Sequence, residues 1–439
     1  MNHNIIEEQI KTKKNQNDGQ SLSAHIGLTT NPFTLVWLSL FFLMATPAQS
    51  QEIEFLIKNG HVFDPKNNID EVLDVAVADG KILKVAPNIK AENTKTVVDA
   101  TGLYVTPGLI DPHTHVFVGT KADKFADGNN SLSPDDFSFK AGITTVVDAG
   151  TSGWRNFPLF KTQVIDESKT RILAFLNIAA TGMTDDSAQN DLNEMDAEKT
   201  AEMIEQYPDV IVGVKIGHFN GESWAPFDRA IEAASTTNRP VFVECHLSQY
   251  RLKDQLDRMR PGDIITHSFE NITEREPVVN KEGRLLPYVM EAKERGILFD
   301  VGHGGAGFWF NQAVPALEQG FWPDSFGTDL HRFSMNAGMK DMLNLMSKYL
   351  NMGMPLKEVL LRGTWNPAKA IGREDLGNLS IGAVADIAIL GLRTGEFGFI
   401  DARNNRIEGD QKFEAELTIR AGKVVWDLNG LAAKDFKMQ

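Results

Sequence analysis

The stretch VTPGLIDPHTHVF, residues 105–117, decides how the chain folds. It begins with apolar residues, turns at Pro107 and Gly108, and places His113 and His115 one residue apart where a strand is expected to end. Side chains at positions i and i+2 of a strand point to the same side, so the two imidazoles project together. One metal ion bound at about 2.0 to 2.1 Å could hold both nitrogens. The pair therefore indicates a metal site at a strand end.

Short apolar runs of the same kind recur through residues 105–378 and alternate with helical patterns. Eight runs are expected strands: GLIDPHTH, ITTVVDAG, ILAFLNIAA, VIVGVKIG, PVFVECHLS, DIITHSFE, ILFDVGHG and SFGTDLH. This α/β pattern permits a doubly wound sheet, but eight repeats favour a closed TIM (β/α)8 barrel. In such barrels the C-terminal ends of the strands form the reaction face.

The flanks of the barrel region share a different pattern. Residues 51–104 contain short alternating runs broken by Asn-Gly, Asp-Gly and Thr-Gly, which is typical of β-hairpins. Residues 379–439 again pair β-runs across an Ala-Gly-Lys turn. We expect the two segments to form the two parts of one composite β-sandwich beside the barrel.

Residues 1–50 have the pattern of a signal peptide and leader. The apolar run at about 33–45 is too short for a transmembrane helix, and the small residues Ala48 and Ser50 precede a cut before Gln51. We therefore predict export, to the periplasm. A buried strand and an uncleaved membrane anchor are the alternatives.

The charge composition of the chain limits the kinds of molecule that it can bind. The 439 residues carry a net charge of −15 and the pI is about 5.2, which argues against nucleic acid or an anionic membrane surface. After leader cleavage we expect a small-molecule substrate and no membrane partner, and a homo-oligomer is compatible with the sequence. The single cysteine, Cys245, excludes an intramolecular disulfide.

Histidines gather at other expected strand ends as well. His246 lies on strand five, His267 on strand six and His303 on strand seven, and His331 follows strand eight. Each alone could be a core or surface residue, but a set that converges on the reaction face of a barrel favours one shared site.

Two further strand ends carry Lys215 and Asp329. Lys215 ends the apolar run VIVGVKIG, where its amine could react with carbon dioxide to form a carbamate that bridges two metal ions; a lysine that reaches solvent at the barrel rim is an equally good interpretation. Asp329 could ligate a metal and accept a proton from bound water. Its alternative role is an N-cap of the next helix.

The strings TPGLIDPHTH, VGVKI, DIITHSFEN, DVGHGG and TDLHRFSMNAGMKD resemble the amidohydrolase superfamily, most closely its amidohydrolase/deacetylase branch of dihydroorotase-like metallohydrolases. The resemblance covers nearly all of the chain after the leader. It implies two divalent ions, zinc above all, with His113 and His115 on the more buried one and a carboxylated Lys215 as bridge. A strand-five ligand and His267 would hold the second ion, and Asp329 would be the catalytic acid and base.

The strand-five ligand departs from the family pattern. In the family register it is the fourth residue after the strand's proline, which from Pro240 is Glu244 rather than His246. Histidine suits zinc, but choosing His246 requires a two-residue slip, so both residues stay candidates. Glu244 would add negative charge and leaves the number of metal ions open.

The resemblance implies hydrolysis by a metal-activated hydroxide, with His303 donating a hydrogen bond to the substrate carbonyl. Arg155 and Arg332 lie on expected reaction-face loops and could bind a substrate carboxylate, although for each a solvated surface arginine is the more common role. Phe117 stands where classical dihydroorotases carry arginine, which weakens a pyrimidine-pathway assignment. We expect an amidohydrolase or deacetylase that cleaves a small acylated amide or ester. A cyclic-amide hydrolase of the dihydroorotase or hydantoinase kind, a mononuclear deaminase and a catalytically retired metal-binding scaffold are the alternatives.

Overall fold

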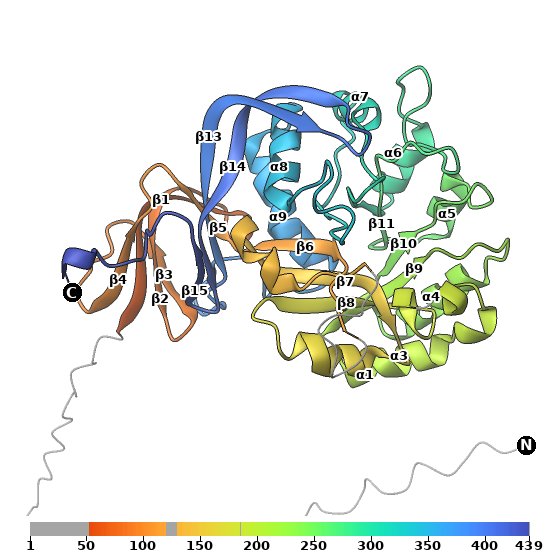
Figure 1. Ribbon diagram of the computed structural model, residues 1–439, viewed down its shortest axis with the longest axis horizontal. Coiled ribbons are helices and arrows are strands. Elements are labelled where there is room, and N and C mark those ends of the chain that lie inside the picture. Colours follow the sequence, from red (N-terminus) through yellow and green to blue (C-terminus); the bar gives the residue numbers. More distant parts are fainter. Residues whose placement is uncertain (1–51, 120–129, 185, 439) are drawn as a thin grey trace, which may run out of the picture. The chain divides into compact units, whose positions relative to one another are not determined.

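Two β-sheets organise the chain in the computed structural model, which describes residues 52–119, 130–184 and 186–438 (Figure 1). Within these residues the parallel sheet has seven strands in sequence order. They are β6 (Leu109–Thr114), β7 (Ile143–Gly153), β8 (Arg171–Asn177), β9 (Ile211–Gly217), β10 (Val241–Glu244), β11 (Ile264–Ile265) and β12 (Leu298–Phe299). Nearly all of their residues are buried, as parallel strands with covered faces require.

The eighth predicted strand closes this sheet into a TIM barrel without forming a continuous ladder. Ser325 bridges to Asp300 beside β12, and Leu330 bridges to Thr114 on β6. Between the bridges, the amides of Gly327 and Thr328 donate to buried carboxylates, at 2.7 Å to Asp300 and 3.0 Å to Asp111. The predicted barrel is therefore confirmed, but its last strand is irregular because side chains take part of its backbone hydrogen bonding.

Helices follow most barrel strands, as the alternating pattern predicts. They are α1 (Phe157–Phe160), α2 (Asp186–Gln189), α3 (Ala197–Gln206), α4 (Ala225–Thr236), α5 (Leu252–Arg258), α6 (Pro287–Glu294), α7 (Phe310–Glu318), α8 (Met342–Asn351), α9 (Leu356–Gly363) and α10 (Trp365–Ala370). Aspartate caps begin two of them: the side chain of Asp196 accepts from the Lys199 amide at α3, and that of Asp341 accepts from the Asn344 amide at α8.

The second sheet is mixed and combines strands from both flanks of the barrel. Its order is β15-β14-β13-β5-β1-β2-β3, with β4 paired to β1. The strands are β1 (Ile53–Asp64), β2 (Ile69–Ala78), β3 (Lys81–Ala86), β4 (Thr94–Asp99), β5 (Tyr104–Pro107), β13 (Ile387–Ile400), β14 (Arg406–Arg420) and β15 (Lys423–Asp427). Its hydrophobic core takes Val75 and Val105 from one flank and Leu417 from the other. The predicted composite β-structure is confirmed, whereas the exact domain limits stay predictions.

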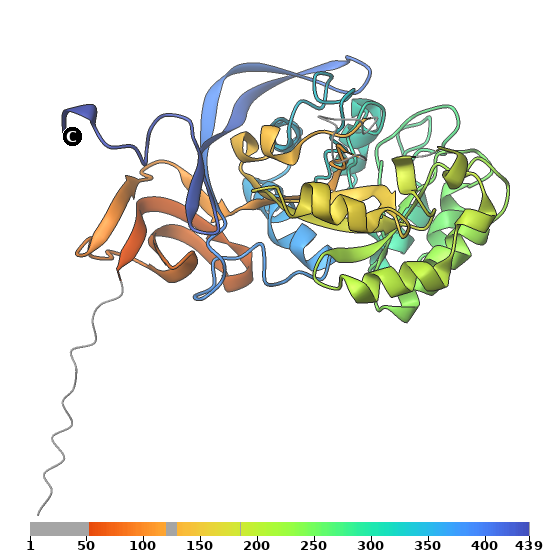
Figure 2. The same ribbon diagram turned by 60° about the horizontal axis from the view of Figure 1, so that its bottom comes forward.

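The long β13–β14 hairpin extends from the mixed sheet across α8 (Figures 1 and 2). At its tip, the amide of Ala402 donates to the Phe308 carbonyl at 3.0 Å, and the buried carboxylate of Asp401 accepts from the Phe310 amide at 3.2 Å. Phe308 itself is fully buried in the main core. The hairpin tip therefore holds the loop that follows β12.

No helix within the described ranges is long and apolar enough to cross a membrane. The predicted signal peptide and leader over residues 1–50 lie outside the described residues.

Candidate metal centre and active site

The barrel brings most of the predicted ligands together at the C-terminal ends of its strands. All but one of these side chains belong to buried residues, and His246 is partly exposed. They are His113 on β6 and His115 just after it, Lys215 on β9, Glu244 and His246 at and beyond the end of β10, His267 after β11, and Asp329 in the closing segment.

Asp329 lies close to His113 on β6 and to His115 just beyond it. Its Oδ1 lies 3.2 Å from Nε2 of His115 and 3.5 Å from Nε2 of His113. Burial raises the pKa of Asp329, but His113 and His115 outweigh this and hold the pKa below its usual range. Burial lowers the pKa of His113 to about 4, so this imidazole is neutral near pH 7, as a metal ligand must be.

The hydrogen-bond partners of His113 and His267 determine which ring nitrogen carries the proton. Nδ1 of His267 lies 2.6 Å from the Gly302 carbonyl, which can only accept, so Nδ1 is protonated. Thr266 donates its hydroxyl proton to Asp300 at 2.9 Å and thus accepts from Nδ1 of His113 at 3.0 Å. Both Nε2 atoms are left bare, buried and without a hydrogen-bond partner among the described residues. Each of these lone pairs can bind a metal ion.

Glu244 collects a second group of side chains. Its Oε2 lies 2.5 Å from Nζ of Lys215, and its Oε1 lies 2.9 Å from Nε2 of His218, 3.0 Å from that of His246 and 3.1 Å from that of His267. Two groups of side chains could each hold a metal ion, because within each group the possible ligand atoms lie within 4.8 Å of one another. One group is His218, Glu244 and His246, and the other is His113, His267 and Asp329. Both candidates for the strand-five ligand thus lie in the site.

His246 is oriented by carboxylates on both sides. Its Nδ1 lies 2.8 Å from Glu270, which also accepts from Arg275 at 3.3 Å. Burial lowers the pKa of His246, but Glu244 and Glu270 outweigh this and raise it to about 9. Glu270 therefore holds the Nδ1 proton and directs Nε2 toward Glu244.

Three site residues adopt the left-handed backbone conformation. The φ angles are 61° at His218, 55° at His267 and 49° at Asp329. Non-glycine residues rarely adopt this conformation, and they do so mostly where function requires it. Gly304 makes room for Asp329, since a Cβ on Gly304 would lie 1.9 Å from Oδ2 of that side chain.

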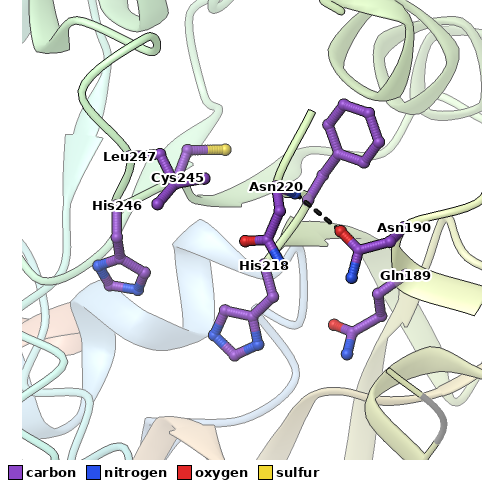
Figure 3. A pocket seen from close by; sticks show the side chains of 8 residues that line it. Gln189, Asn190, His218, Asn220, Cys245, His246 and Leu247 are labelled. Atoms are coloured by element: carbon purple, nitrogen blue, oxygen red, sulfur yellow. Dashed lines mark hydrogen bonds between the residues drawn. The ribbon is translucent and has the colours of Figure 1, made fainter. Parts of the chain in front are cut away.

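Two cavities open beside these groups. The first, of about 180 Å³, reaches the candidate ligands and is lined by His115, Asn130, Ser131, Thr151, Met183, Thr184, His218, Glu244, Asp329 and His331. The second, of about 270 Å³, is lined by Gln189, Asn190, His218, Phe219, Asn220, Cys245, His246 and Leu247 (Figure 3). His218 lines both cavities, and its imidazole and that of His246 point to the same side in Figure 3.

Comparison with known proteins agrees with this geometry. A model of the amidohydrolase family matches residues 310–425. A deacetylase from Brucella anthropi is 30% identical over 369 residues, which cover 81% of this chain and 88% of that protein. This chain belongs to the amidohydrolase superfamily. Crystal structures of an adenine deaminase and a dihydroorotase are both 27% identical, with TM-scores of 0.78 and 0.75, and the matches cover 86% and 85% of this chain and 100% and 99% of those chains.

As a member of this superfamily, the chain is a hydrolase acting on C–N bonds, and it belongs to enzymes that generally depend on divalent metal ions. The donor set fits such ions. It combines bare imidazole nitrogens with the carboxylates Asp329 and Glu244, in buried surroundings.

One predicted catalytic residue of this amidohydrolase lies behind the site. His303 is fully buried, and its Nδ1 lies 3.0 Å from the Gly304 carbonyl. Its Nε2 lies 2.8 Å from Nζ of Lys348, which donates. Because both ring nitrogens are engaged, His303 would have to break a bond to contact substrate, and this role stays a prediction.

The two predicted substrate arginines of the amidohydrolase lie at the surface. Arg155 pairs with Glu194 at 2.7 Å and is 49% exposed in its side chain, and Arg332 lies over the ring of Phe333. Neither arginine is among the described residues that line the two cavities. Their carboxylate-binding role is therefore a prediction that this geometry does not support.

The sequence interpretation missed His218, Thr266, Asp300 and Glu270. A signal for His218 was present, because it follows Lys215 by three residues at the end of an expected strand. The other three act through contacts between strands, which no local pattern reveals.

Proposed function

We propose that the chain is a metal-dependent hydrolase that removes a short acyl group from a small amide or ester. The observation that carries this proposal is the pair of bare, buried Nε2 atoms of His113 and His267, beside the carboxylate of Asp329 at the edge of a cavity of about 180 Å³. This arrangement combines a metal-binding donor set with a proton acceptor and room for a small substrate.

The candidate ligands have different roles in the proposed mechanism. His113, His115 and Asp329 would hold one ion, and His267 and His246 a second, with His246 giving up its Nε2 proton on binding. Asp329 would serve both as ligand and as base. Bound divalent ions supply an activated water and polarise the scissile carbonyl. Asp329, ionised because its pKa is lowered, accepts the proton of the water and returns it to the leaving nitrogen or oxygen. Zinc as the metal and a carbamate on Lys215 stay predictions.

The cavity linings support a small polar substrate. The linings include amides and hydroxyls, from residues such as Asn130, Ser131, Thr151 and Asn220, and the described lining residues include no lysine or arginine. The similarity to a deacetylase at 30% identity favours an N-acyl or O-acyl group. A cyclic amide is the second candidate, favoured by the likeness to a dihydroorotase at 27% identity.

A substrate panel tests the proposal. Metal-loaded enzyme is assayed with N-acetyl amino acids, acetylated hydroxy acids, dihydroorotate, hydantoins and adenine. We expect hydrolysis of an acetylated member, and Asp329→Asn should lower its turnover by about 10² to 10⁴ while metal content falls much less. Opening of a cyclic amide alone would support the second candidate. If the metal-loaded parent acts on no member, the retired-scaffold interpretation is favoured.

Export stays a prediction, because the signal peptide lies outside the described residues. N-terminal sequencing of protein from cells should find Gln51 as the first residue, and recovery of the intact leader in the cytoplasm would contradict it. A homo-oligomer is likewise a prediction, which the mass of the purified enzyme in solution decides.

A further inference from the structure

We propose that Glu244, rather than a carbamate on Lys215, is the carboxylate that joins the two metal positions, and that His218 is a ligand of the second. Lys215 then stays an unmodified amine that pairs with Glu244. This inference rests on the proposed metal-dependent function and specifies its metal site. It departs from the carbamate bridge that the family resemblance implies.

The two oxygens of Glu244 already face the two groups. Oε2 lies 2.5 Å from Nζ of Lys215 and 4.0 Å from Nε2 of His113, on the side of the first position. Oε1 lies within 3.1 Å of Nε2 of His218, His246 and His267, on the side of the second. One carboxylate thus spans both positions, as a bridging ligand must.

The same carboxylate occupies the space that a carbamate needs. Carbon dioxide would add to the amine of Lys215 with loss of a proton, and both new oxygens would lie about 2.3 Å from Nζ. Oε2 of Glu244 already lies 2.5 Å from that nitrogen, so two negative groups would share one place.

Lys215 has little freedom to move aside. It is fully buried, and its Nζ lies 4.9 Å from the centre of the Phe242 ring. A Cβ on Gly150 would lie 2.4 Å from Cγ of Lys215, which shows how closely the β7 backbone packs against the lysine stem. The pairing with Glu244 is therefore built into the barrel wall.

His218 completes the second position. It follows the last residue of β9, its side chain is 37% exposed, and its Nε2 lies 2.9 Å from Oε1 of Glu244. A surface histidine needs no left-handed backbone, yet His218 shares this conformation with His267 and Asp329. Since His218 lines both cavities, a metal ion bound there would be open to substrate.

The bridging group can be identified directly in the parent protein. The full chain, stripped of metal with a chelator, is reloaded with Zn²⁺ in CO₂-free buffer or in buffer with ¹³C-bicarbonate, and zinc per chain is measured by elemental mass spectrometry. We expect about two zinc ions per chain in both buffers, and ¹³C NMR of the labelled sample should show no carbamate resonance.

Variants test the two residues separately. Lys215→Met should keep its zinc, because the amine is no ligand. His218→Asn should lower the affinity for the second zinc ion by at least about tenfold, because loss of even a residue that only supports a metal ligand lowers metal affinity by about 10- to 100-fold. Asn220→Ala, whose side chain lines the same cavity, is the matched control and should leave zinc affinity unchanged.

The outcomes separate this inference from the proposed function. A carbamate resonance, or zinc loading that requires bicarbonate, would overturn the role of Glu244 and leave the metal-dependent hydrolase intact. An unchanged zinc affinity in His218→Asn would overturn the role of His218. If the parent binds no zinc in either buffer, the inference and the proposed function both fail. The NMR measurement needs no variant and decides whether a carbamate bridges the ions, even if Lys215→Met does not fold.

Discussion

Replacing Gly304 by alanine should displace Asp329 from its place beside His113 and His115. A Cβ on Gly304 would lie 1.9 Å from Oδ2 of Asp329, whereas real Cβ contacts are not found below 3.0 Å, so the carboxylate must move by about 1 Å. A misplacement of this size in a reacting group costs about 10²-fold in rate. The φ of +44° at Gly304 adds a folding cost of about 1 to 2 kcal/mol for any residue with a Cβ.

Gly305→Ala is the matched control for this prediction. Gly305 is the next residue, it is exposed, and its Cβ would meet no heavy atom of the described residues within 4 Å. The assay compares kcat/KM on the best acylated substrate, metal content and urea unfolding for both variants. We expect a loss of about 100-fold in Gly304→Ala alone. Full activity in Gly304→Ala, or an equal loss in Gly305→Ala, would refute the assigned place of Asp329.

Three further predictions concern the surroundings of the site. Thr266→Val should raise the Kd for zinc by about 10- to 100-fold, because His113 loses the hydrogen-bond partner of its Nδ1. A competition with a chelator measures this Kd. Thr114→Val, on the same strand as His113, is the control and should leave the Kd unchanged. Burial lowers the pKa of Lys348 to about 7, so the folded chain binds fewer protons than the unfolded chain above that pH and its stability rises with pH. Between pH 7 and pH 9, the free energy of unfolding should therefore rise by about 2 kcal/mol less in Lys348→Met than in the parent, as measured by urea unfolding. Removal of metal with a chelator should abolish hydrolysis and lower the Tm, and re-added Zn²⁺ should restore both. A metal ion at 100 times its Kd raises the free energy of unfolding by about 2.7 kcal/mol.

Features that depend on residues close together in the sequence could be predicted from the sequence. The spacing of His113 and His115 predicted that both side chains lie together at the end of β6, where both approach Asp329. Runs such as VIVGVKIG marked buried strands because parallel strands are covered on both faces. The pairing of the two flanks was predictable because both flanks carry the same pattern of short β-runs and glycine turns, and β5 does pair with β13.

The remaining features arise from contacts between distant segments. The eighth strand is irregular because Asp300 and Asp111 take its amides, and neither partner is visible in SFGTDLH itself. The choice between Glu244 and His246 could not be made from register, because the chain turns after β10 and brings both side chains to the site. His303 looked catalytic by its place at a strand end, but Lys348, 45 residues later, engages its second nitrogen.

The β13–β14 hairpin also determines when the enzyme becomes complete. During synthesis β13, the strand that pairs with β5, is made after all strands and helices of the barrel. Until then β5 is an open sheet edge, and the Phe308 loop lacks the Ala402 and Asp401 contacts that hold it. A chain that stops before Ile387 would therefore contain every proposed metal ligand and still lack the support that fixes the reaction face.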